Sequence, residues 1–172
     1  MTDLVSKIKG ARNFFEKIVA VIPGFKGYVE RSNRRDADKL LRTTVASRYE
    51  EQWSRISELQ RQLVAQGQIE SLDDLEASVM KLRALVDRVR HAAYGYSGFF
   101  DAVKVNEAEL DKLYQYDSTL LDKVALVSGA VDNVASSIGG EGLPAAVRNL
   151  TALAQECIDL FDRRGEVILT SG

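Results

Sequence analysis

The stretch Gly27–Gly67, GYVERSNRRDADKLLRTTVASRYEEQWSRISELQRQLVAQG, decides the fold. It contains no proline, and no glycine between its two ends. Its apolar residues recur at three- and four-residue steps, at Ala37, Leu41, Val45, Tyr49, Trp53, Ile56, Leu59 and Leu63. That spacing places them on one face of a helix. The stretch therefore predicts one long helix over residues 28–66, which Gly67 ends.

The same spacing extends to the rest of the chain and predicts helices over 3–22, 72–93, 107–138 and 144–164. Pro23-Gly24 ends the first of these, because proline lacks an N–H and glycine accepts the turn. Short connections favour antiparallel neighbours. We therefore expect a single all-α domain over residues 1–172, an up-and-down bundle of four long antiparallel helices with a shorter amphipathic N-terminal helix. The basic first turns of helix 28–66 are expected to project beyond helix 72–93.

Charge is divided unevenly along the chain. Residues 1–48 hold 11 Lys/Arg and 5 Asp/Glu, a net of +6; residues 49–172 hold 12 and 20, a net of −8, and the two sum to −2. A basic front and an acidic back predict either an anionic partner or head-to-back contact between copies. The sequence shows no apolar run of about 20 residues and no signal-peptide pattern, so a cytoplasmic protein is expected.

The residues that carry chemistry are sparse. His91 is the only histidine, and Arg88 stands where a Glu-x-x-His metal motif requires glutamate. Cys157, the only cysteine, falls within an apolar stripe, so we predict a buried thiol rather than a nucleophile. Residues 139–142 are glycine-rich but lack the Lys and Ser/Thr of a phosphate-binding loop. The sequence predicts no enzyme, no catalytic residues, no cofactor and no metal.

Two stretches are candidate partner-binding surfaces. The first is the basic start of helix 28–66, with Arg31, Arg34, Arg35, Lys39 and Arg42. Interleaved acidic residues allow pairing within the helix, so a nucleic-acid partner is not favoured over an acidic protein or a second copy. The second is the connection expected between helices 72–93 and 107–138, with Tyr94, Tyr96, Phe99 and Phe100. These aromatic side chains either cap the bundle or pack against another molecule.

The N-terminal helix has two interpretations. Its basic residues Lys7, Lys9 and Lys17 and its aromatic residues Phe14 and Phe15 are typical of an interfacial anchor on an anionic membrane. The alternative is that the same apolar face docks on the bundle.

Two segments also look familiar, IPGFKGYVERSNRRDADKLLR (Ile22–Arg42) and YGYSGFFDAVKVNEAELDKLYQYD (Tyr94–Asp117). They resemble segments of an uncharacterised family of small bacterial all-helical proteins. The resemblance implies a bacterial, cytoplasmic, all-helical protein, and it assigns no activity and no residue roles. Our leading prediction is a non-catalytic helical adaptor or scaffold that acts through protein–protein contacts and self-associates. The alternative is a peripheral membrane protein anchored by the N-terminal helix.

Overall fold

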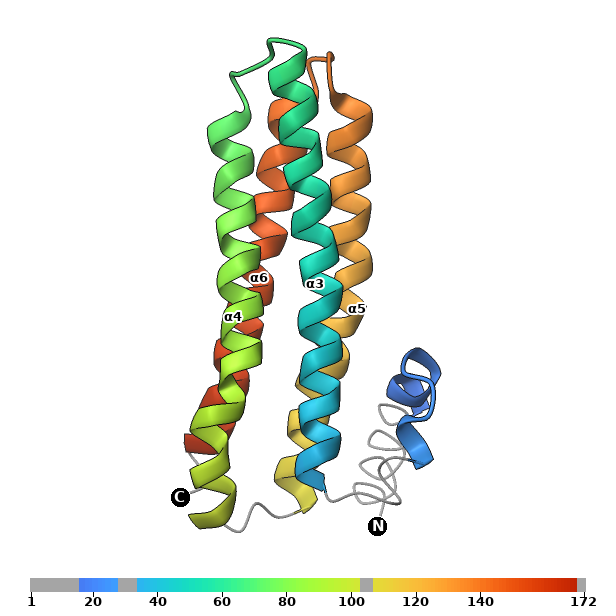
Figure 1. Ribbon diagram of the computed structural model, residues 1–172, viewed down its shortest axis with the longest axis vertical. Coiled ribbons are helices and arrows are strands. Elements are labelled where there is room, and N and C mark those ends of the chain that lie inside the picture. The colour runs from blue at the N-terminus through green and yellow to red at the C-terminus, as the bar shows by residue number, and fades with distance from the viewer. Residues whose placement is uncertain (1–15, 28–33, 103–106, 170–172) are drawn as a thin grey trace, which may run out of the picture.

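Helices make up all the regular secondary structure in the residues that the structure, a computed structural model, describes: 16–27, 34–102 and 107–169. Four long helices dominate, α3 (Arg34–Ala65), α4 (Leu72–Ala102), α5 (Glu107–Ser137) and α6 (Leu143–Leu169). They lie side by side along one long axis (Figure 1). The predicted all-α fold is confirmed.

Each long helix packs against two of the others. α3 contacts α4 and α5, and α6 contacts the same two helices from the other side. α3 and α5 begin at the end where α4 and α6 finish, and we call this end the base (Figure 1). At the opposite end, the apex, residues 66–71 join α3 to α4 and residues 138–142 join α5 to α6.

The predicted apolar stripes form the core. In α3 the buried members are Leu41, Val45, Tyr49, Ile56, Leu59 and Leu63, and in α4 they are Leu75, Val79, Leu82, Val86 and Val89. α5 and α6 contribute their own stripes to the same cluster. Full burial of one such side chain stabilises a fold by about 1.5–3 kcal/mol, so this shared core holds the four helices together.

Glycine forms the turn after two of the long helices. Gly67 has a φ of 71° and follows α3, and Gly139 has a φ of 83° and follows α5. Residues with a side chain rarely adopt this left-handed conformation, so glycine is favoured where a helix ends this way. The predicted end of the second helix at Gly67 is confirmed.

Two helix boundaries differ from the prediction. α4 continues to Ala102 instead of ending at residue 93, and α6 continues to Leu169 instead of ending at residue 164. Two glycines within a helix cost only about 1 kcal/mol each relative to alanine, and no proline interrupts either extension. As a result α3 and α4 have 32 and 31 residues in the described part of the chain, and the predicted projection of the second helix falls on residues 28–33, which lie outside it.

The chain before α3 is described over residues 16–27. Residues 16–21 are helical, a turn follows at Pro23-Gly24 as predicted, and residues 25–27 are helical again. Ile18, Ile22 and Phe25 are buried and belong to the same cluster as the cores of the long helices. Residues 3–15 of the predicted first helix and residues 28–33 of the predicted second helix lie outside the described residues.

Candidate interaction surfaces and the buried polar layer

The predicted basic surface is located at the base. Arg34 and Arg35 open α3, and Lys39 is exposed one turn later; Arg31 lies outside the described residues. Arg42 is only 5% exposed, so its assignment to a binding surface was wrong. Arg42 follows Leu41, which is fully buried, so this part of α3 faces the interior over a wider arc than the predicted stripe.

The predicted aromatic connection is helical. Tyr94, Tyr96, Phe99 and Phe100 all fall within α4, near its end at the base. The assignment of these residues to a loop was therefore wrong, because the two glycines among them cost too little to end the helix. Whether they contact a partner stays a prediction.

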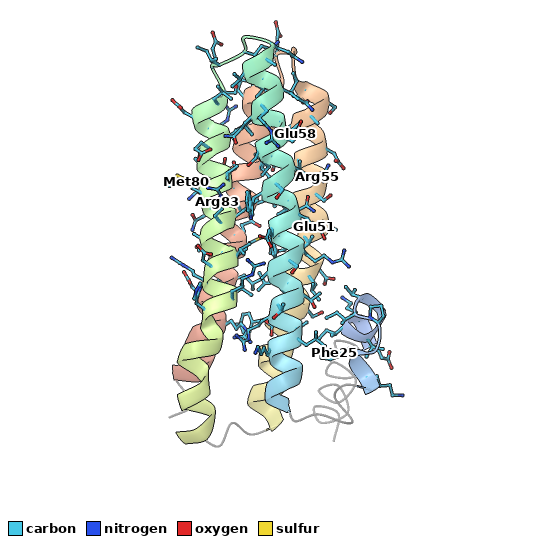
Figure 2. All side chains as sticks on the ribbon, viewed as in Figure 1. Phe25, Glu51, Arg55, Glu58, Met80 and Arg83 are labelled. Atoms are coloured by element: carbon cyan, nitrogen blue, oxygen red, sulfur yellow. The ribbon has the colours of Figure 1, made fainter. Side chains whose placement is uncertain are left out.

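The described part of the N-terminal segment docks on the long helices. Phe25, which is labelled in Figure 2, is 0% exposed, and the Lys17 ammonium lies 3.3 Å from the Asp122 carboxylate of α5. Lys17 was one of the predicted membrane-contacting residues, and here it forms an exposed ion pair within the chain. The other four, Lys7, Lys9, Phe14 and Phe15, lie outside the described residues.

His91 and Cys157, the two candidates for a base and a nucleophile, differ in their exposure to solvent. His91 is exposed on α4, and its Nδ1 lies 2.8 Å from the carbonyl oxygen of Asp87. Because α4 runs on to Ala102, His91 lies inside the helix and not at its end. Cys157 is buried, as predicted.

Cys157 lies next to a buried polar side chain, Tyr49. The Tyr49 hydroxyl donates a hydrogen bond of 2.6 Å to the Leu120 carbonyl and lies 3.4 Å from the Cys157 sulfur. Burial raises the pKa of Tyr49 above its ordinary range. Burial also raises the pKa of the Cys157 thiol, against the smaller lowering effects of the Tyr49 hydrogen bond and of Lys123. Both groups are therefore neutral near pH 7, and a neutral thiol is a poor nucleophile.

One salt bridge is fully buried. Arg164 of α6 donates to Asp117 of α5 twice, Nε to Oδ1 at 2.7 Å and Nη2 to Oδ2 at 3.1 Å. The two side chains are 0% and 1% exposed. Asp117 was visible in the sequence as a polar break in the apolar stripe of α5, but nothing in the sequence identified Arg164 as its partner. A bidentate pair of this kind requires a defined geometry, so it aligns α5 with α6.

The outer surface carries several polar links between helices. Arg55 of α3 donates to Ser128 of α5 at 2.9 Å and forms an ion pair with Asp132. The guanidinium of Arg83 on α4 lies 4.5 Å from the ring centre of Trp53 on α3. Arg55 and Arg83 are labelled in Figure 2. These contacts connect α3 to α5 and α3 to α4 along the length of the helices.

The apex, unlike the sides of the helices, has a hollow with exposed apolar side chains next to it. A hollow of about 510 Å³ lies between the two connections, and its lining includes Ile69, Glu70, Glu141 and Pro144. Ile69 is 65% exposed, and Val64, in the last turn of α3, is 58% exposed. The sequence analysis missed this surface, although both connections were recognised.

Three comparisons of the chain with known proteins found no similar protein. No protein-family model, no curated protein and no solved structure matches the chain. The resemblance to a bacterial helical family therefore stays a prediction. Across residues 16–27, 34–102 and 107–169 no group of three or more His, Cys, Asp or Glu side chains is placed to hold a metal ion. Within the same ranges, no helix has the length and apolar character needed to cross a membrane.

Proposed function

We propose that this chain is a non-catalytic helical adaptor or scaffold that acts through protein–protein contacts and self-associates in the cytoplasm. In this proposal the four long helices form an up-and-down antiparallel bundle, which serves as a stiff rod with a binding surface at each end. The N-terminal segment is an attachment to the side of that rod.

The observation that supports the proposal is the distribution of charge along the rod. Along its length, carboxylates meet cations from neighbouring helices, as in the pairs Arg88–Asp162, Arg90–Glu50 and Lys123–Glu156. The ends do not follow this pattern. At the base α3 begins with Arg34 and Arg35 next to Asp36, and at the apex Glu70 and Glu141 have no ion-pair partner among the described residues. Carboxylates without a partner at one end favour contacts that attract cationic surfaces electrostatically and reject like-charged ones.

The binding experiment compares charge reversals at matched total charge. The double change Arg34→Glu/Arg35→Glu removes two cations from the base, whereas Arg48→Glu/Arg88→Glu makes the same change in net charge on exposed residues along the side of the rod. Light scattering over a concentration series should show a reduced mass only for the variant at the base. Circular dichroism should show equal helix content in all three proteins. Equal masses for both variants and the unaltered chain would remove the base from consideration.

The second candidate, a peripheral membrane protein anchored by residues 3–22, requires the N-terminal segment to leave its docked position. Ile18, Ile22 and Phe25 are buried against the helices, so they cannot contact lipid while docked. Co-sedimentation with anionic vesicles tests this directly. Binding that Phe15→Glu abolishes, and that neutral vesicles do not support, would favour membrane anchoring over the scaffold.

A further inference from the structure

The helices α4 and α6 pack side by side in one constant register. Lys81 of α4 donates to the side-chain oxygen of Gln155 at 2.6 Å, and the two residues are 74 positions apart in the chain. Arg88 donates to Asp162 at 2.8 Å, again 74 positions on. Two helices that keep the same offset run in the same direction, and both begin at the apex (Figure 1). A residue of α4 is therefore level with the residue of α6 that lies 74 positions later.

Near the apex the surface between α4 and α6 opens into a groove of about 420 Å³. Small or apolar side chains line much of it, namely Ala77 of α4 and Val147 and Ala152 of α6. The two alanines are exposed, whereas Val147 is buried. Further toward the base, the Arg88–Asp162 ion pair bridges the same two helices. The groove is thus the open part of a surface that is bridged elsewhere.

Two opposite charges stand on the two sides of the groove. Asp74 of α4 and Arg148 of α6 both line it, both are exposed, and the offset of 74 makes them level. Neither forms an ion pair with a residue whose side chain the structure describes. Asp74 lies in the first turn of α4, where the helix dipole favours a carboxylate. The dipole does not favour Arg148 in the same way, because cations are favoured at the carboxyl end of a helix.

We infer that this groove is the contact surface between two copies of the chain, related by a two-fold axis parallel to the helices. Such an axis places α4 of each copy on α6 of the other, with level residues facing each other. Asp74 of each copy then meets Arg148 of the other, so one contact forms two ion pairs. Lys81 faces Gln155 of the second copy, the same residue type that it binds within its own chain. The charged residues of the groove therefore meet no like charge.

The groove also offers apolar surface to a second copy. The methyl side chains of Ala77 and Ala152 leave room for another helix. Met80, which is labelled in Figure 2, is 62% exposed and follows Ala77 by three residues, so the two are neighbours on the surface of α4. An apolar centre with complementary charges at its rim is typical of a protein–protein interface.

This inference rests on the self-association in the proposed function and adds a contact on the side of the rod, apart from the base. Each copy uses its groove once, so the contact closes at two chains and does not propagate. The variant Arg34→Glu/Arg35→Glu, in which association through the base is lost, should therefore still dimerise. Its mean mass should rise with concentration and level off at that of two chains.

The test adds either Asp74→Arg or Arg148→Asp to this base variant of the full chain. Each change sets like charges opposite each other at both pairs of the two-fold contact, so the dissociation constant of the dimer should rise at least about tenfold. Mixed in equal amounts, the two proteins should form a mixed dimer, because both pairs again join an arginine to an aspartate. The matched controls are Asp87→Arg on α4 and Arg163→Asp on α6, on exposed residues away from the groove, and they should dimerise like the base variant.

Light scattering gives the masses, and circular dichroism checks that the helix content is equal throughout. If the base variant is monomeric at every concentration while the unaltered chain associates, the groove contact is wrong, although self-association through the base stands. If the unaltered chain is also monomeric, the proposed self-association fails with it. Dimers that survive both single changes must use another surface. If Asp74→Arg/Arg148→Asp in one chain dimerises but the mixture does not, the two residues act within one chain and the two-fold pairing is wrong.

Discussion

Replacing Asp117 with asparagine tests whether the buried salt bridge holds α5 and α6 together. Asparagine keeps the shape of the side chain but removes the negative charge that faces Arg164. In the folded chain the guanidinium is 0% exposed and donates two hydrogen bonds, of 2.7 and 3.1 Å, to that carboxylate. The substitution leaves a cation inside the core opposite a neutral amide, which can accept from Arg164 only through its single carbonyl oxygen.

The expected loss of stability is large. Breaking a buried pair by removing one partner costs about 3–5 kcal/mol, since the remaining charge stays out of water. A domain of ordinary stability has about 5–15 kcal/mol in total, so this one substitution removes a major part. Replacing both partners, as in Asp117→Leu/Arg164→Met, should cost less than the single substitution, because the buried cation is removed together with the carboxylate.

The chain provides a close control on α6, the helix of Arg164. Arg88 also donates two hydrogen bonds to a carboxylate, Asp162, at 2.8 and 3.0 Å, but these side chains are 49% and 55% exposed. Asp162→Asn should therefore cost less than about 1 kcal/mol. Urea unfolding followed by circular dichroism, with the free energy extrapolated to water, compares the two substitutions in one assay.

The two substitutions should differ clearly in the free energy of unfolding that they remove. Similar losses for Asp117→Asn and Asp162→Asn would mean that burial of the Arg164–Asp117 pair does not raise its contribution, and the account of the interior given above would be refuted. A double variant at Asp117 and Arg164 that is no more stable than Asp117→Asn alone would mean that the buried charge of Arg164 is not the cause of the loss.

Three further predictions follow from the core and the turns. Burial raises the pKa of Tyr49 and of Cys157 above the ordinary values of 10.0 and 9.0, so the unfolded chain releases these protons first. The free energy of unfolding, fully maintained below about pH 9, should therefore fall as the pH rises, by up to about 1.4 kcal/mol per pH unit for each group. Urea unfolding at about pH 8 and 10.5 should show a smaller fall for Tyr49→Phe/Cys157→Ala, and an equal fall would contradict the assignment. Phe25→Ala should cost about 3–5 kcal/mol if the N-terminal segment unfolds together with the long helices; a loss below about 1 kcal/mol would mean that it detaches independently. Gly67→Ala should destabilise by about 1–2 kcal/mol because of its left-handed backbone. Gly129→Ala, inside α5 with open space around the added methyl group, should instead stabilise by about 0.5–1 kcal/mol, and thermal melts of the two variants should shift in opposite directions.

The periodicity of apolar residues in the sequence was sufficient to predict the helices and most of the buried core residues. Leu41, Val45 and Leu63 are buried where the spacing placed them, and Gly67 ends α3 where expected. These features depend on neighbours three and four residues apart, which a helix brings together whatever lies around it. The sequence was misleading at residues 94–100, where two glycines indicated a connection but α4 continues. Glycine's effect on a helix is small, and the wider context outweighs it.

The sequence by itself determined that this chain folds as helices with a basic front and an acidic back, and which faces of the helices are apolar. Only the tertiary structure decided that Arg42 is covered, that Asp117 meets Arg164, and that Glu70 and Glu141 share the rim of one hollow. Each of these depends on side chains distant in sequence, whose meeting is set by how the helices align and not by any local pattern. Local spacing determines which face of a helix is apolar, whereas the packing of whole helices determines which charges meet, which are buried and which remain exposed at the ends.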